Sequence, residues 1–303
     1  MVKAADSAHV IGANALQVFA DNPTAWRRRR GPPRELAAFR DRLAAHDIAP
    51  LAIHAPYLVN LAGPDEVFYG RSIALLAHDL RAAPAFGARF FNVHIGSHLG
   101  SGVDVGTARL ADGLRSALGD VDDGADSTMV VLENAAGSGF GLGVDVAELA
   151  SIAEAIDARG VPSDRVGFCL DTAHAWGAAI DLAEPAATDA FLADFDARIG
   201  LDRLVMIHLN DSKTERGSRL DRHEHVGAGQ IGATGLAHLL GHPALAHVAW
   251  FLETPGMDEG YDAVNMSRVR DLEGGRPLAA LPPEAMSVRG SRSRSGPPLG
   301  PGE

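Results

Sequence analysis

Histidine and acidic side chains end six successive apolar runs of this sequence, and these residue types bind metal ions. In chain order they are His54, His94, Glu133, Asp171, His208 and Glu253. Imidazole nitrogens and carboxylate oxygens together suit zinc, with manganese or iron as further options. One histidine at such a position is more often an ordinary core or loop residue, but chance is a poor explanation for six such positions. Because buried charges must be paired, the set predicts a metal centre.

Two short motifs extend this set. In DTAH, His174 follows Asp171 by three residues, where an apolar run turns into a helical pattern. In DRHEH, Asp221 and His223 are two residues apart, so an extended segment would point both side chains the same way. Nine candidate ligands are enough for more than one metal ion, and sites with two or three metal ions suit phosphodiester hydrolysis. Four further histidines are interpreted as ordinary core or loop residues: His78, His238, His242 and His247.

These candidate ligands need a scaffold of alternating strands and helices. Short β-branched or aromatic runs predict strands at 15–20, 49–54, 89–94, 128–133, 166–171, 203–208 and 248–253. Longer periodic segments predict helices at 33–46, 67–83, 104–118, 145–159, 185–199 and 234–241, with a last one near 265–272. Such alternation indicates an α/β protein with a parallel sheet, either open and doubly wound or closed into a barrel.

The strand count favours a TIM (β/α)8 barrel that lacks its first β-strand at the N-terminus. A complete barrel has eight strands, whereas this chain opens with a helical stretch, 2–11, ended by Gly12. The carboxyl ends of barrel strands converge on one mouth, which would gather the strand-end ligands. Without the first strand, edges between strands 15–20 and 248–253 would be exposed, and core layers would be lost.

Composition indicates the size of the core, the cellular compartment and the limits of the folded domain. With 46% hydrophobic residues, the 303-residue chain can bury a large core. We expect no transmembrane helix and no signal peptide, and therefore a cytoplasmic protein. Cys169, the only cysteine, is predicted to be a core thiol. Segment 1–283 is predicted to form the barrel domain, and the Arg-, Ser-, Gly- and Pro-rich segment 284–303 a disordered tail.

The net charge of −12 argues against a simple basic nucleic-acid binder. Metal ions held by the acidic residues would reverse that balance locally, because they would be the largest charges in the site. Nothing in the sequence indicates a dimer seam, so we expect a monomer.

Seven segments, in the right order between about residues 2 and 275, resemble the endonuclease IV family of zinc-dependent abasic-site endonucleases. They are HAPYLVNLA (54–62), NVHIGSHLG (92–100), VLENAAGSG (131–139), CLDTAHAWGAAIDL (169–182), HLNDSK (208–213), GSRLDRHEHVGAGQIG (217–232) and LETPG (252–256). The DxxH and DRHxxxGxGxIG elements are specific to this family rather than shared by barrels at large.

This resemblance implies a (β/α)8 barrel with three zinc ions, of which Mn²⁺ could replace some. His54, His94 and Glu133 would hold the first ion. Glu133 would bridge to a second, also held by Asp171, His208 and Glu253; the third would be held by His174, Asp221 and His223. The implied reaction is hydrolysis of the phosphodiester 5′ to an abasic site, leaving a 3′-hydroxyl and a 5′-deoxyribose phosphate. Its implied catalytic residues are Glu133, Asp171 and Glu253.

The resemblance also implies duplex DNA with abasic sites as the partner, bound by the cytoplasmic enzyme at the nucleoid. Tyr57 and Leu58 would enter the duplex and stabilise the flipped-out sugar. Predicted phosphate contacts beside the ligands are Lys213, Arg219 and Arg222. The run 27–30, four arginines, could contact phosphates or be a solvated surface.

Two alternatives use the same residues. A single-metal sugar isomerase or epimerase of the same barrel superfamily would need only Glu133, Asp171, His208 and Glu253, which leaves five candidate ligands without a purpose. A non-catalytic truncated barrel that binds damaged DNA would retain little zinc. Fold resemblance alone does not decide between these functions.

Overall fold

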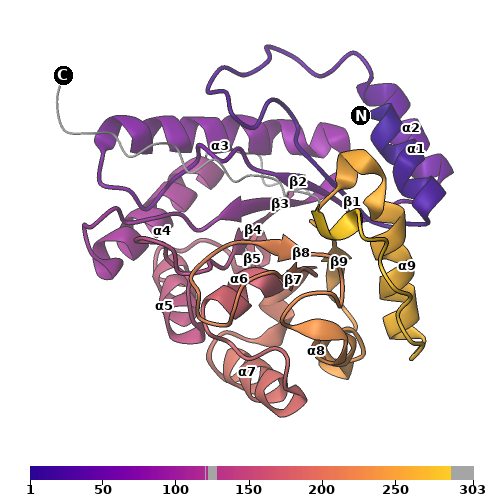
Figure 1. Ribbon diagram of the computed structural model, residues 1–303. Coiled ribbons are helices and arrows are strands. Elements are labelled where there is room, and N and C mark those ends of the chain that lie inside the picture. Colours follow the sequence, from indigo (N-terminus) through magenta and orange to yellow (C-terminus); the bar gives the residue numbers. More distant parts are fainter. Residues whose placement is uncertain (120, 122–127, 288–303) are drawn as a thin grey trace, which may run out of the picture.

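A computed structural model describes residues 1–119, 121 and 128–287 (Figure 1). At its centre, seven parallel strands in the order β1-β2-β3-β4-β5-β6-β9 form a nearly closed barrel. They are β1 (Leu16–Val18), β2 (Leu51–His54), β3 (Ala88–His94), β4 (Met129–Glu133), β5 (Val166–Asp171), β6 (Leu204–His208) and β9 (Ala249–Phe251). All seven predicted strands are therefore confirmed.

Helices cover the outside of the barrel. The larger ones are α1 (Val2–Ile11), α2 (Leu36–Ala45), α3 (Glu66–Phe86), α4 (Val103–Gly119), α5 (Val146–Asp157), α7 (Pro185–Arg198), α8 (Gly232–Leu240) and α9 (Tyr261–Glu273). Each predicted helix is present, with small shifts at its ends. The short helix α6 (Thr172–Gly177) lies where the DTAH motif turns into a helical pattern, whereas the antiparallel pair β7 (Asp211–Ser212) and β8 (His223–Glu224) was not predicted.

Local sequence sets where the helices begin and end. Asp145 caps α5 by accepting a hydrogen bond from the backbone N–H of Glu148, whose carboxylate in turn accepts from the backbone N–H groups of Gly143 and Val144. Gly87 ends α3 at a φ of 76°, a left-handed conformation that favours glycine. These signals fix each connection between strand and helix.

The core has two layers. The larger lies between the sheet and the helices and includes Phe168, which packs against Phe195 with ring centroids 6.0 Å apart. The smaller fills the barrel interior with Ala52, Phe90, Val131, Cys169, Met206 and Phe251. Cys169 is buried, as predicted, and burial raises the pKa of its thiol to about 12. A thiol with that pKa stays protonated and is not a nucleophile.

The barrel has a seam between β1 and β9. Within the described residues, no backbone ladder joins these strands, and they are the two ends of the sheet order. This is the architecture predicted from the strand count. One side chain bridges the seam: Gln17 on β1 donates a hydrogen bond to Glu253, which follows β9.

The last described residues, up to 287, contact the rest of the chain. Residues 288–303 of the predicted tail lie outside that part of the chain. Its first four residues, 284–287, are described. Ala285 is buried, and its carbonyl oxygen accepts a hydrogen bond from the ring of His225 at 3.0 Å. Ala285 thus packs against the rest of the described chain. No helix in the described ranges has the length and apolar character to cross a membrane.

We expect Phe168→Ala to destabilise the chain by about 3–5 kcal/mol, because it leaves a cavity at a side chain that is 1% exposed. The matched control is Phe140→Ala, at a ring 53% exposed, which should cost well under about 1 kcal/mol. Urea denaturation followed by circular dichroism measures both. Equal losses of stability would contradict this description of the core.

Candidate metal centre

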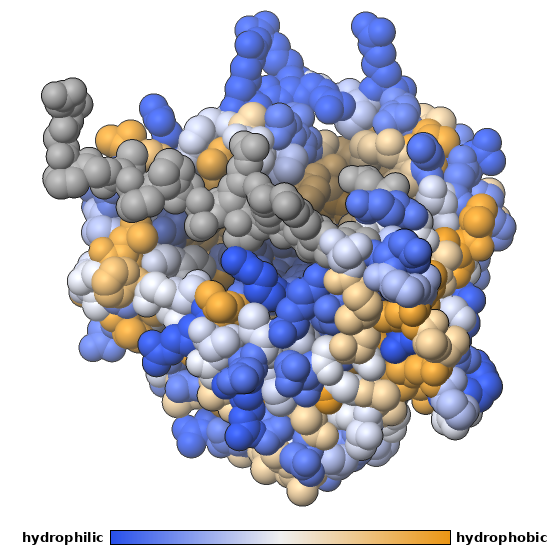
Figure 2. All heavy atoms as spheres, viewed as in Figure 1, coloured by the Kyte–Doolittle hydropathy of each residue, from blue (hydrophilic) through white to orange (hydrophobic). Residues whose placement is uncertain are grey.

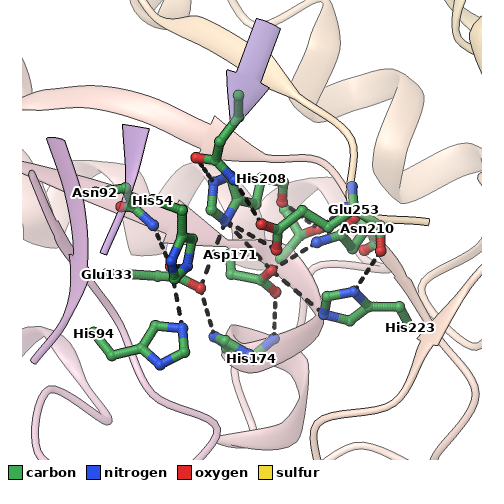
Figure 3. A network of polar contacts seen from close by, with 12 residues as sticks. His54, Asn92, His94, Glu133, Asp171, His174, His208, Asn210, His223 and Glu253 are labelled. Carbon is green, nitrogen blue, oxygen red and sulfur yellow. Dashed lines mark hydrogen bonds and ion pairs between the residues drawn. The ribbon is translucent and has the colours of Figure 1, made fainter. Parts of the chain in front are cut away.

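The strand ends bring the predicted ligands together at one mouth (Figure 3). The register pairs His94 directly with Glu133 across β3 and β4, and Asp171 with His208 across β5 and β6. The imidazole rings point toward the buried carboxylates of Glu133 and Asp171. Hydrophilic side chains border the central hollow on the face seen in Figure 2. The convergence expected of barrel strands is thus present.

The first group consists of His54, His94 and Glu133. The Nε2 atoms of both histidines lie 3.6 Å from Glu133 Oε2. The ligand atoms of the three residues all lie within 4.8 Å of one another. One cation at this place could contact two imidazoles and one carboxylate oxygen.

The second group shares Glu133 with the first. His208 Nδ1 lies 3.5 Å from Glu133 Oε1, 3.9 Å from Asp171 Oδ2 and 3.3 Å from Glu253 Oε2. Because the two oxygens of Glu133 face two different groups, this carboxylate can bridge two cations.

The third group is built by α6 and by the β7–β8 pair. Asp171 caps α6 by accepting a hydrogen bond from the backbone N–H of His174, which places that ring beside the mouth. The β7–β8 pair positions His223, whose Nε2 lies 3.6 Å from Asp171 Oδ2. Asp221 contacts both rings, at 3.4 Å from His174 Nε2 and 3.0 Å from His223 Nε2. All nine predicted ligands therefore lie in this mouth.

Hydrogen bonds orient the rings for metal binding. In three of them, Nδ1 faces a main-chain carbonyl oxygen: Ala55 for His54, Asn134 for His174 and Glu253 for His223. A carbonyl oxygen only accepts, so Nδ1 carries the proton and the neutral ring offers Nε2 as a ligand. Ring nitrogens of metal-binding histidines are oriented in this way.

Three buried ligand-type atoms of the mouth lack a hydrogen-bond partner. Among the described residues, these are Glu133 Oε1, His208 Nδ1 and His223 Nε2. Buried polar groups are rarely left unpaired, because each costs about 1–3 kcal/mol. The donor set of nitrogen and carboxylate oxygen matches zinc. The residues present therefore fit a bound cation.

The surrounding charges shift the pKa of several groups in the mouth. Burial lowers the pKa of His174, but the charges of Asp171 and Asp221 outweigh it and raise that pKa well above its ordinary value. The same balance raises the pKa of His223 to about 9. Burial raises the pKa of Glu133, yet the imidazoles hold it well below the usual range. Glu133 therefore stays charged, with the protonated ring of His174 3.3 Å from its Oε1.

Each carboxylate of the second group receives one hydrogen bond from a neutral amide. Asn92 donates to Glu133 at 2.5 Å, Asn210 to Asp171 at 2.6 Å, and Gln17 to Glu253 at 2.7 Å. These three amides were missed in the sequence. Asn92 precedes His94 by two residues and so shares its face of β3, which was the available signal. Neutral donors orient the carboxylates without cancelling their charge.

Gln17 holds two ligands of one group at the same time. Its Nε2 donates to Glu253 Oε1, and its Oε1 accepts from His208 Nε2 at 3.1 Å. The second bond fixes the proton of His208 on Nε2 and leaves Nδ1 free to bind. Gln17 therefore couples β1, β6 and the segment after β9 across the open seam.

The predicted DNA contacts lie around the mouth. Tyr57 is 60% exposed, with its ring 5.6 Å from that of His54 and 6.1 Å from that of His94. Burial of its hydroxyl and the charges of the mouth carboxylates raise the Tyr57 pKa to about 12, so the phenol is neutral at neutral pH. Leu58 beside it is only partly exposed.

Basic side chains near the mouth differ in their surroundings. Arg219 and Arg222 are exposed, and Arg222 donates to the carbonyl of ligand-type residue Asp221 at 2.6 Å. Lys213 is partly buried, with Nζ 3.9 Å from Glu224. Within the run 27–30, the Arg28 side chain is only 6% exposed, and its Nε lies 3.2 Å from Asp79 Oδ1. The idea that the whole run contacts phosphates is therefore wrong for Arg28.

Comparisons with known proteins give consistent results. A family model described as xylose isomerase-like TIM barrel matches residues 5–272. The chain is 39% identical over 263 residues to the probable endonuclease 4 of Methanoculleus marisnigri, covering 87% of this chain and 91% of that one. It is 40% identical over 262 residues to the probable endonuclease 4 of Halobacterium salinarum, covering 86% and 91%.

Two solved structures superpose on this chain. Endonuclease IV from Thermus thermophilus superposes with a TM-score of 0.77 at 34% identity, covering 90% of this chain and 94% of that one. A D-tagatose 3-epimerase-like protein superposes with a TM-score of 0.63 at 16% identity, covering 87% of this chain and 91% of that one, a likeness of fold alone.

We expect Gln17→Ala to weaken divalent-metal binding about 10–100-fold, because metal sites usually lose that much with an orienting partner. Competition with a fluorescent zinc chelator measures the affinity. Gln230→Ala, at an exposed glutamine, is the matched control. Equal affinities in the two variants would show that Gln17 does not position the ligands.

Proposed function

The chain belongs to the endonuclease IV family of xylose isomerase-like TIM barrels, and we propose that it incises duplex DNA at abasic sites. The reaction is hydrolysis of the phosphodiester 5′ to the abasic site, which leaves a 3′-hydroxyl and a 5′-deoxyribose phosphate. Its substrate is duplex DNA, and the proposed form is a cytoplasmic monomer acting at the nucleoid.

The observation that carries this proposal is a set of nine ligand-type side chains that lie next to one another in the mouth. A single-metal sugar isomerase would use only the group of Glu133, Asp171, His208 and Glu253. The other five lie in the same mouth, and the ion pairs that their imidazoles make with carboxylate oxygens span 3.0–3.6 Å. A multi-metal site suits phosphodiester chemistry, which supports the endonuclease over the isomerase.

Three zinc ions are the proposed cofactor, with Mn²⁺ able to replace some of them. His54, His94 and Glu133 would hold one; Glu133, Asp171, His208 and Glu253 the second; and His174, Asp221 and His223 the third. When bound, such ions lower the pKa of water and neutralise negative charge that develops on phosphate oxygens.

In this proposal, the chain's own side chains orient the attacking water and accept a hydrogen bond from it. Glu253 is the most exposed carboxylate of the second group, and Gln17 fixes one of its oxygens. The other oxygen, Oε2, can accept a hydrogen bond from the attacking water and orient it toward phosphorus. Glu133 and Asp171 are fully buried and keep the two sides of the mouth at a fixed separation.

The rim would hold the DNA. Tyr57 presents an exposed, neutral aromatic ring next to the ligands, which suits insertion beside a flipped-out sugar. Leu58 adjoins it as a second apolar contact. Lys213, Arg219 and Arg222 stand on or beside the loop that carries Asp221 and His223, where they would contact phosphates.

We expect Glu253→Gln and His94→Ala each to lower the incision rate at least about 100-fold, since each removes a ligand or an orienting group from the mouth. The assay is nicking of a duplex oligonucleotide with one tetrahydrofuran abasic analogue, which resists lyase chemistry. Glu154→Gln, on the exposed face of α5, is the control. Wild-type nicking in either mouth variant would refute the assignment.

We expect Asp221→Ala to lower the zinc content by about one ion per chain, because the third group would lose its carboxylate while the first two remain intact. Inductively coupled plasma mass spectrometry after gel filtration measures the stoichiometry. The exposed Asp202→Ala serves as the comparison. An unchanged zinc content would count against a third ion at this place.

A further inference from the structure

A second group of ligand-type side chains lies outside the barrel. Helices α7 and α8 pack side by side (Figure 1). Asp189 on α7 contacts His238 on α8. His238 Nε2 lies 2.5 Å from Asp189 Oδ1, and His242 Nε2 lies 3.6 Å from the same oxygen. The three ligand atoms lie within 4.8 Å of one another. None of these residues belongs to the mouth.

The sequence interpretation treated both histidines as ordinary residues. Their spacing of four nevertheless places them near each other, with ring centroids 5.8 Å apart. His238 on α8 and His242 just beyond the end of that helix can therefore offer their imidazoles to one ion. The carboxylate comes from 49 residues earlier in the chain, so only the fold completes the group.

The electrostatic setting favours a cation. His238 lies in the last turn of α8, and His242 follows the end of that helix. The carboxyl end of a helix carries a partial negative charge, which adds to the charge of Asp189. The three side chains are 54%, 29% and 18% exposed for Asp189, His238 and His242. Water can therefore complete the coordination shell, as in zinc sites with three protein ligands.

Two local contacts oppose binding. The hydrogen bond between His238 Nε2 and Asp189 Oδ1 must open, because its proton lies where the ion would bind. His242 Nδ1 accepts a hydrogen bond from the backbone N–H of Ala244, a long contact at 3.3 Å. A neutral ring that accepts at Nδ1 carries its proton on Nε2, so binding at Nε2 requires the loss of this contact. Because the turn is exposed, water can replace the ring as the partner of the Ala244 N–H.

We propose that Asp189, His238 and His242 form a divalent-metal site, separate from the mouth, that ties α7 to α8. Two imidazoles and one carboxylate select Zn²⁺, Ni²⁺ or Cu²⁺ over Mg²⁺ or Ca²⁺, which prefer oxygen ligands. A bound ion would stabilise the folded chain, because the unfolded chain does not hold these ligands together.

The test titrates Ni²⁺ into the zinc-loaded full chain by isothermal calorimetry. We expect about one extra Ni²⁺ per chain, and binding at least about tenfold weaker in His238→Gln, His242→Gln and Asp189→Asn. His78→Gln is the matched control: His78 also pairs with one carboxylate, Asp79 at 3.0 Å, but belongs to no group of three ligands in the described residues.

A second measurement is thermal unfolding with and without Ni²⁺. At about a hundredfold excess over the wild-type Kd, the wild type and His78→Gln should gain about 5 °C in Tm, and His238→Gln should gain about half of that or less. All variants should keep the circular dichroism spectrum and nicking rate of the wild type. Equal Ni²⁺ binding and equal Tm shifts in His238→Gln and the wild type would overturn the proposal, leaving an ion pair between α7 and α8.

Discussion

The structure depends on the charge of Glu133, a carboxylate that is buried and yet ionised. Removing such a group from water is very costly unless positive charge compensates it. Imidazoles surround both of its oxygens, and the carboxylates of Asp171 and Glu253 lie against the same His208 ring. This concentration of negative charge calls for cations. With the proposed ions bound, the mouth would present positive charge to a phosphodiester although the net charge of the chain is −12.

The barrel supplies the precision that this network needs. Parallel register sets His94 against Glu133 and Asp171 against His208, so the backbone ladder fixes two pairs directly. Amides then orient the carboxylates, and main-chain carbonyls orient three of the rings. At the seam between β1 and β9, the described backbone offers no ladder, and the Gln17 side chain links the strands instead. The weakest part of the sheet is thus bridged by a residue that also orders the site.

Strand positions and the mouth ligands could be predicted because both follow from short-range patterns. A buried strand ends where its apolar run ends. Because the carboxyl ends of barrel strands converge, a ligand-type residue at that end lies at the mouth. The β7–β8 pair has two residues on each side, too few for a pattern. Gln17 is a polar residue within an apolar run, and its partners lie 191 and 236 residues away. Arg28 lies in a basic run that suggests solvent, whereas the fold buries its side chain against Asp79.

The two groups of ligand-type residues show how burial decides whether the charges of the same residue types need a cation. In the mouth, Glu133, Asp171 and His208 are at most 1% exposed, so solvent cannot screen their charges and the cations or protons must always be present. Between α7 and α8, half of Asp189 is in water, so the pair with His238 is stable without a metal. The mouth should therefore hold its ions through purification, whereas the outer group should bind and release a metal ion as its concentration changes. Where an ion binds, burial of its ligands would favour retention, and exposure of ligands of the same types would favour exchange.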